Sequence, residues 1–591
     1  MAPPHSTVAE STAENPAESI AATGTVTGTV TGIVIDAGFA PPTSDLFKYI
    51  ALLIGATVII TVFISWLANA TSNGVAGAAI DVPGNTITVA LADEPPQLDS
   101  TRATDQISHM ILGHVMEGLL RYDAQNKLVP GVAERWEIRP DGATFHLRDS
   151  ARWSDGKPVT AADFVFAWRK VVDPKTASEY AFIMYSVKNA KAINTGKLSI
   201  EKLGVRAVDA STLEVAFERP LAFFDKLVAF SVYFPVRQDF YEAQQGRYGA
   251  NAENMLFNGP FKLTRWVHGA QLRIERNPLY WNQHLAKLNA VNFGYITSDG
   301  NAWLNLFRDG KIAWAGLDSE NLKTAMEQRW HIRREITGST YYIEFNERPN
   351  RPTRNVHLRR AMLLVFDPGE LVNKVIKIPG NLAAYSLFPN WIRGEQGSFL
   401  DEYPPPWHDR VDIAAAKREL EIARAELGTI PPLVLLNSES SIADKQAEYF
   451  QSLFKETLGL ELRIDKQTFK QRLAKMTAGQ FDLVAAGWGP DYDDGLTFGD
   501  LFASWNLNNR GRYNNPELDR QVHIAESSLD QHERLAAFAA IQKIEYDEAV
   551  IIPNYQQGKV FVEDPRLRGV VKRAVGPSPD YTNAYIADKT L

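Results

Sequence analysis

The sequence predicts a mixed α/β fold, and three observations support this. Of the 591 residues, 45% are apolar and 22% are charged, which is the composition of an ordinary globular protein. Strand-like and helix-like segments alternate between residues 431 and 490. Thr160 and Asp163 form a capping box at the start of an apolar helix, and that helix must stop near Pro174.

Four segments in the first half of the chain are strand-like. Residues 87–91 alternate weakly between apolar and polar side chains. Residues 144–148 follow an Asp-Gly turn and place Phe145 and Leu147 on one face. Residues 261–265 and 271–275 flank a short turn that contains glycine. We therefore expect two single strands and one hairpin.

The second half of the chain has the clearest architecture. A helix is expected over residues 412–427, because Asp412 can cap its start and Gly428 lies just past its end. A β-α-β-α-β unit follows, with its elements at residues 433–436, 444–456, 460–464, 468–476 and 481–486. Right-handed crossovers would make the three strands parallel, and ligands of such sheets bind outside the carboxyl ends of the strands.

The third strand of this unit leads directly into the loop 487–495, which combines glycine, aromatic and acidic residues. Gly487 and Gly489 allow the backbone to approach a ligand closely. Trp488 and Tyr492 offer flat contact area. Three carboxylates offer charge for a cation such as an ammonium group: Asp491, Asp493 and Asp494. A plain surface turn rich in Gly, Pro and Asp would have the same composition, so both interpretations stay open here.

The N-terminal region differs from the rest of the chain. Residues 1–48 are low in complexity and fit a cytoplasmic tail. Residues 49–70 form an uncharged apolar run that is long enough to span a hydrocarbon core of about 30 Å. The run is either a transmembrane anchor or a signal segment, since a small-residue cleavage pattern lies at 68–70. In both cases the body is exported, and residues 71–81 would be a linker.

Composition also excludes several function classes. The chain has no cysteine, which excludes disulfides, thiolate nucleophiles, cysteine-ligated metal sites and a lipid anchor on cysteine. A net charge of −8 argues against nucleic-acid binding. The sequence contains no HExxH, P-loop, GxSxG or dinucleotide-binding motif. We therefore expect no enzyme activity, no cofactor and no metal.

Seven segments of the chain match the motifs of one known family in that family's order: residues 92–100, 115–120, 144–156 with 160–166, 258–261, 275–281, 355–361 and 486–492. Any one of these segments would be weak evidence alone. Together they make the chain, from about residue 86 to its end, resemble the family-5 solute-binding proteins of bacterial ABC importers, most closely the oligopeptide-binding members.

This resemblance implies a two-lobed periplasmic-binding-protein fold, type II-like, with an extra accessory domain. Lobe I would be discontinuous, the accessory domain would follow its first segment, and two chain crossings near Asn346 and residue 560 would form a hinge. The implied bounds are 82–116, 240–345 and 560–591 for lobe I, 117–239 for the accessory domain and 346–559 for lobe II.

The resemblance also implies a function. The protein would be a monomeric, extracytoplasmic component of an ABC importer, which captures oligopeptides by lobe closure and delivers them to permease and ATPase subunits. It would be held at the inner membrane, or exported, by residues 49–70. An oligosaccharide or another small solute as ligand, or a peptide-sensing receptor without import, are the alternatives.

Family members place particular residues around the ligand, and the matching positions here follow from the resemblance. Asp491 would take the α-ammonium group of the peptide. Gly487 and Trp488 match one pairing edge, and Thr104 and Asp105 fall where the opposing edge is expected. The other candidate contact residues are Tyr180, Trp314, Phe469, Gly489 and Tyr492.

Two positions depart from the oligopeptide-binding pattern. Ala485 stands where those proteins carry an arginine, and Ala443 stands where they carry a histidine. Both groups suit the C-terminal carboxylate of a short peptide. Their replacement favours a ligand that is longer or lacks a free carboxylate.

Overall fold

The computed structural model describes residues 78–221, 223–406 and 411–587. The chain divides into two compact units, 1–74 and 75–591, and all described residues belong to the second. The predicted tail and the apolar segment 49–70 lie outside the described residues. Within the described ranges, every helix is too short or too polar to cross a membrane.

A five-stranded sheet contains the N-terminal strands of the described chain, in the order β1-β2-β11-β10-β9. The predicted strand and hairpin are confirmed as β2, β9 and β10, and β2 pairs in parallel with β11. The predicted linker 71–81 is too long at its C-terminal end, because β1 pairs with β2 and Ile80 is buried. The elements are β1 Ile80–Asp81, β2 Thr86–Leu91, α2 Gln106–Val115, β9 Phe261–Val267, β10 Gln271–Arg276 and β11 Ala290–Ile296.

A four-stranded antiparallel sheet, β5-β6-β8-β7, lies within the segment predicted as the accessory domain. It packs with α3, and Phe145 of β6 and Phe164 of α3 are both fully buried. The predicted capping box is present, since the Thr160 amide donates to Asp163 Oδ2 at 2.9 Å. The main elements are β5 Ala133–Arg139, β6 Gly142–Leu147, α3 Ala161–Val172, β7 Val205–Ala207 and β8 Thr212–Ala216.

Short elements surround this sheet. They are β3 Leu120–Tyr122, β4 Leu128–Pro130, η1 Ala181–Ser186, α4 Ala190–Asn194, η2 Ile200–Lys202, α5 Phe224–Leu227, η3 Ser231–Tyr233, α6 Gln238–Ala243 and η4 Ala252–Asn254.

A seven-stranded sheet forms the C-terminal half, in the order β12-β18-β13-β17-β15-β16 with β14 beside β18. The β-α-β-α-β unit is confirmed, because β15 pairs in parallel with both β16 and β17. The strands are β12 Trp314–Leu317, β13 Ile332–Phe345, β14 Leu382–Ala383, β15 Leu433–Ser438, β16 Leu462–Gln467, β17 Leu483–Trp488 and β18 Ile551–Glu563, and the crossover helices are α13 Ser441–Leu458 and α14 Phe469–Ala478.

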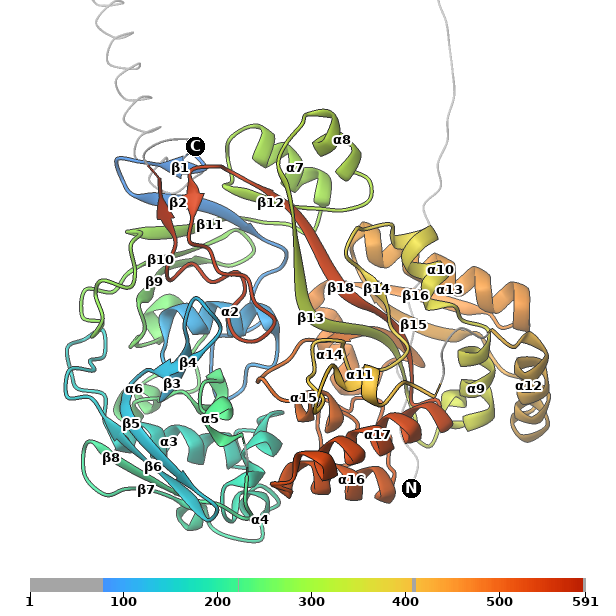
Figure 1. Ribbon diagram of the computed structural model, residues 1–591, viewed down its shortest axis with the longest axis horizontal. Coiled ribbons are helices and arrows are strands. Elements are labelled where there is room, and N and C mark those ends of the chain that lie inside the picture. The colour runs from blue at the N-terminus through green and yellow to red at the C-terminus, as the bar shows by residue number, and fades with distance from the viewer. Residues whose placement is uncertain (1–77, 222, 407–410, 588–591) are drawn as a thin grey trace, which may run out of the picture. The chain divides into compact units, whose positions relative to one another are not determined.

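Two long strands, β13 and β18, run side by side in opposite directions (Figure 1). They reach from β12 to the parallel strands, so this sheet includes residues from both predicted lobes. The remaining elements are α7 Gly300–Arg308, α8 Leu322–Glu327, η5 Pro352–Arg354, α9 Val356–Leu364, α10 Pro368–Glu370, η6 Leu371–Ile376, α11 Phe399–Glu402, α12 Ile413–Leu427, α15 Leu496–Gly499, α16 Pro516–Ser527, α17 Gln531–Asp547, β19 Leu567–Arg568 and β20 Tyr585–Ile586.

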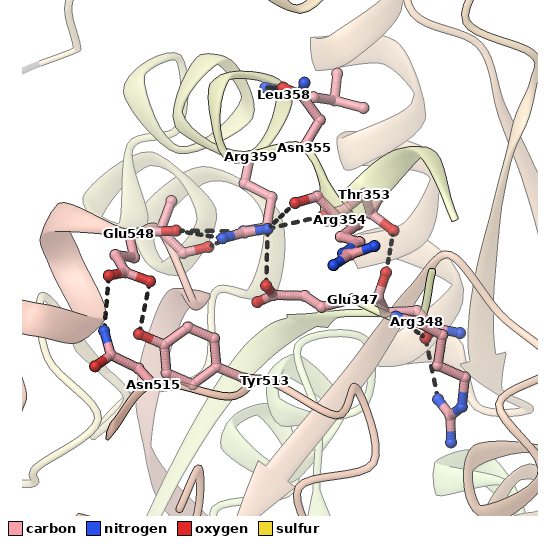
Figure 2. A network of polar contacts seen from close by, with 12 residues as sticks. Glu347, Arg348, Thr353, Arg354, Asn355, Leu358, Arg359, Tyr513, Asn515 and Glu548 are labelled. Atoms are coloured by element: carbon pink, nitrogen blue, oxygen red, sulfur yellow. Dashed lines mark hydrogen bonds and ion pairs between the residues drawn. The ribbon is translucent and has the colours of Figure 1, made fainter. Parts of the chain in front are cut away.

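A buried arginine connects α9 to the ends of β13 and α17 (Figure 2). Arg359 is 2% exposed and pairs with the Glu347 carboxylate at 3.0 Å. Its other N–H groups donate to the carbonyls of Thr353, Arg354, Glu548 and Ala549. The motif at 355–361 therefore has a structural role, since it supplies a fully bonded cation inside the C-terminal half.

Candidate functional site

A cavity of about 290 Å³ opens beside the carboxyl end of β17. Its lining comes from residues 92–109, from Tyr180, from β13 and from the chain between α14 and Arg510. Ligands of α/β sheets bind at this position, outside the carboxyl ends of parallel strands. The loop that the sequence singled out therefore lies at a topologically favourable place.

Most of the predicted contact residues meet at this cavity. Those that line it are Thr104, Asp105, Tyr180, Phe469, Gly487, Trp488, Gly489 and Asp491. Tyr492 is not in its lining: it is 3% exposed and stacks on Phe223 with ring centroids 5.6 Å apart. Trp314 also lies elsewhere, on β12, where its indole N–H donates to the Tyr581 hydroxyl at 2.8 Å.

Asp491 is the carboxyl group of the loop that lines the cavity. Its Oδ1 accepts a hydrogen bond of 3.0 Å from the Tyr180 hydroxyl, and its amide donates to Thr497 Oγ1 at 3.0 Å. In the part of the chain that the structure describes, no cation lies within ion-pair distance of this carboxylate. Burial raises the pKa of Asp491 to about 8, and the Tyr180 hydrogen bond only partly offsets this. Such a carboxylate can accept a cationic group of a ligand.

Aromatic side chains lie beside Asp491. Tyr180 packs edge-on against Trp488, with centroids 6.3 Å apart, and against Phe230, with centroids 5.4 Å apart. The indole nitrogen of Trp488 is buried and has no hydrogen-bond partner among the described residues. His109 Nδ1 lies 2.7 Å from Ser231 Oγ, and burial lowers the pKa of His109 to about 3, so the ring is neutral at pH 7.

The end of β17 has one open edge. On one side β17 pairs with β13 along its whole length, but on the other side β15 pairs only with Leu483 and Val484. Residues 485–488 therefore have no strand partner on the side of β15. Gly487 is required here, because a Cβ atom at this position would lie 2.8 Å from the ring of Tyr341. This edge is available to an added strand.

Several charged residues of the cavity were missed by the sequence analysis. Arg510 pairs with Glu179 at 2.7 Å, and Glu344 accepts a hydrogen bond from the Gly511 amide. Burial raises the pKa of Glu344 to about 7, and burial together with Glu439 raises the pKa of Asp93 to about 6. These residues come from loops and strand interiors, where local sequence does not indicate side-chain direction.

Arg472 was also missed, although a signal was present. It follows Phe469 by three positions on α14, and residues with that spacing share one helix face. Because Phe469 was already a candidate, Arg472 could have been placed beside it.

Contacts distant in sequence hold the cavity together. Besides the Tyr180–Asp491 and Glu179–Arg510 pairs, Arg219 lies 2.5 Å from Glu526. All three pairs link the segment 117–239 to the C-terminal half. The cavity is therefore enclosed by parts of the chain that can separate only if these contacts break.

The chain belongs to family 5 of the bacterial extracellular solute-binding proteins, because the sequence model described as "Bacterial extracellular solute-binding proteins, family 5 Middle" matches residues 127–509. The periplasmic oligopeptide-binding protein OppA of Salmonella typhimurium is 32% identical over 518 residues, which cover 84% of this chain and 92% of that protein. The family is one of solute-binding proteins, which agrees with the expectation that the chain is no enzyme.

Solved structures agree with the two-lobed fold. The Listeria monocytogenes OppA bound to peptide matches with a TM-score of 0.80 and 29% identity, covering 85% of this chain and 99% of that one. The murein tripeptide-binding protein MppA in its unliganded open form, also 29% identical, covers 86% of this chain and 98% of that one, but its TM-score is 0.58. The described part of the chain is thus closer in arrangement to the peptide-bound structure.

Proposed function

We propose that this protein is the substrate-binding component of an ABC importer and that it captures peptides in the cavity beside β17. The observation that carries the proposal is Asp491, a partly buried carboxylate at the end of an open strand edge, which has no cationic partner among the described residues. A peptide supplies what both features lack, namely an α-ammonium group and a backbone that can pair.

The peptide backbone adds to the free edge of β17 as a further strand. In antiparallel pairing, the N–H and C=O of one residue point to the same side, so alternate residues face the ligand. Leu483 pairs with β15, and two residues further on the carbonyl of Ala485 accepts a hydrogen bond from Arg472 of the cavity. Two residues further again, Gly487 presents its N–H and C=O on the same side, toward the ligand. Main-chain bonds of this kind give affinity without demanding particular ligand side chains.

The ammonium group of the peptide binds Asp491, whose carboxylate Tyr180 orients. A charge-assisted hydrogen bond away from water is stronger than a neutral one. Asp491 sits on the C-terminal half and Tyr180 on the segment 117–239, so ligand contacts to both favour closure. Ligand thereby shifts the population toward the closed arrangement.

Delivery and location form the second part of the proposal. The closed form would be read by permease and ATPase subunits, and the protein would act as a monomer on the extracytoplasmic face of the membrane. Residues 49–70 would anchor or export it. The relative from Salmonella is named periplasmic, which supports this location.

Native mass spectrometry of the protein purified without denaturation tests the proposal. We expect bound masses that dissociate on unfolding and fragment as peptides. Masses spaced by hexose units would instead assign the cavity to an oligosaccharide, with Trp488 and Phe469 stacking on sugar rings. ATP hydrolysis by the reconstituted permease complex, stimulated only by the peptide-loaded protein, would separate an importer component from a receptor.

A further inference from the structure

The loop that follows β17 has a second side, which lines a groove of about 870 Å³. Residues between Gly487 and Asp491 line the peptide cavity, whereas residues 493–495 line the groove. The cavity and the groove are therefore separated by one short loop. A partner that binds in the groove contacts the same segment that holds the peptide.

The walls of this groove come from parts of the chain that are distant in sequence. One wall belongs to the segment 117–239 and contains Lys127, from the turn between β3 and β4, and Lys226 of α5. The other wall belongs to the C-terminal half and contains residues 391–393 and residues between 529 and 538. Lys226 Nζ donates a hydrogen bond of 2.6 Å to the Asp493 carbonyl and so joins the two walls. The groove is therefore complete only while both parts of the chain are together, as they are around the peptide cavity.

The groove carries an excess of positive charge. Four cations and two carboxylates line it, in a protein whose net charge is −8. Of these cations, Arg534 pairs with Asp494 at 2.6 Å. Among the described residues, no carboxylate lies within ion-pair distance of Lys127, Lys226 or Arg393. Lys127 and Arg393 are exposed, so each wall offers a cation to an incoming anion.

Apolar side chains lie between these charges. Ile392, Leu535 and Phe538 line the groove and are buried, and Leu529 lines it with a side chain that is 60% exposed. An apolar surface rimmed by charged residues is typical of an interaction site. A protein segment with both apolar and acidic side chains complements this groove. A free phosphate ion would leave the apolar surface uncovered.

We propose that the groove is the docking site for an acidic segment of the membrane permease, whose carboxylates pair with Lys127 and Arg393 and whose apolar side chains cover Leu529. This inference rests on the proposed function and names the surface through which delivery takes place. Because the two walls meet only in the closed arrangement, the segment binds that arrangement. Peptide and permease are then coupled, and each raises the affinity for the other by the same factor.

The affinity of the full chain for the permease and ATPase complex tests the inference, measured by thermophoresis without ATP and with both proteins in detergent. In the wild type, saturating tetra-alanine should raise this affinity by about tenfold. The double variant Lys127→Glu with Arg393→Glu should lower it by about tenfold in the presence of the peptide. Raising the salt concentration should weaken the wild type more than this variant, because screening acts on the charge pairs.

Two controls separate docking from folding and from total charge. Calorimetry should give the groove variant the peptide affinity of the wild type, because neither Lys127 nor Arg393 lines the peptide cavity, and this also shows that the variant folds. The matched control is Lys175→Glu with Arg418→Glu, which makes the same charge change at exposed positions outside the groove. Its affinity for the permease should equal that of the wild type.

The outcomes are distinguishable from failure of the proposed function. Wild-type permease affinity in the groove variant, or an equal loss in the matched control, would overturn the docking site while leaving peptide capture and delivery intact. Loss of peptide affinity in the groove variant would overturn it as well, because the residues would then act through the peptide cavity. Peptide binding without any binding of the wild type to the permease would overturn delivery, and absence of peptide binding would overturn the proposed function itself.

Discussion

Replacing Asp491 by asparagine removes the group that ionises when the ammonium binds, and it changes little else. The side chains have the same shape, and the Tyr180 hydroxyl can still donate to the remaining side-chain oxygen. The variant should therefore fold. It should lose the charge-assisted bond to the ammonium group of the peptide.

The size of the loss follows from two opposing effects. Truncating one partner of a buried, hydrogen-bonded charge pair weakens binding by roughly 2–5 kcal/mol. Burial raises the pKa of Asp491 to about 8, so ionising this carboxyl group at pH 7 costs about 1.4 kcal/mol. This cost lowers the affinity of the wild type, and the asparagine variant does not incur it. The net loss is about 2 kcal/mol, or roughly thirtyfold in Kd.

Isothermal titration with tetra-alanine at pH 7 measures this difference. The control is Asp493→Asn, an exposed carboxylate of the same loop, which should leave Kd within about twofold. Unchanged affinity in Asp491→Asn would refute the assignment of the ammonium site. Equal losses in both variants would point to a long-range charge effect instead of a contact.

Four further results are expected. At pH 6.5, below the pKa of Asp491, peptide binding should release close to one proton, as measured in buffers of different ionisation enthalpy, and affinity should rise with pH toward 8; no proton release would contradict the pairing. Gly487→Ala should weaken binding several-fold by titration, because its methyl group would press on the ring of Tyr341; wild-type affinity would contradict the close approach. Arg359→Met should lower the free energy of unfolding in urea by about 3–5 kcal/mol, since its carboxylate partner would stay buried and unpaired, and an unchanged midpoint would contradict this. Trp314→Phe should leave peptide affinity unchanged, because Trp314 lies outside the cavity; a tenfold loss of affinity would contradict this placement.

The parallel unit of the C-terminal half could be predicted from sequence because its signals are local. Each strand is a short apolar run, and both crossover helices end at a glycine with positive φ, Gly459 and Gly479. The long strand β13 could not be predicted. Its middle, residues 337–340, is polar and carries a register shift against β18, so the alternation that marks a strand is interrupted.

The site could be predicted only in part. Asp491 and Gly487 stood out because they follow a strand directly, which is a local fact. The hydrogen bond between Tyr180 and Asp491 joins residues 311 positions apart; the family resemblance indicated that each lies in the cleft, but not that they pair. Tyr492 was misplaced because the chain bends at residues 491–494, so the side chain next to Asp491 turns into the core and stacks on Phe223.

A crystal structure of the protein with tetra-alanine tests the central claim most directly. We predict that the peptide pairs with the free edge of β17, with its ammonium nitrogen within about 3 Å of an Asp491 carboxylate oxygen. A peptide bound in another cavity, or one lying here with its carboxylate toward Asp491, would contradict the account.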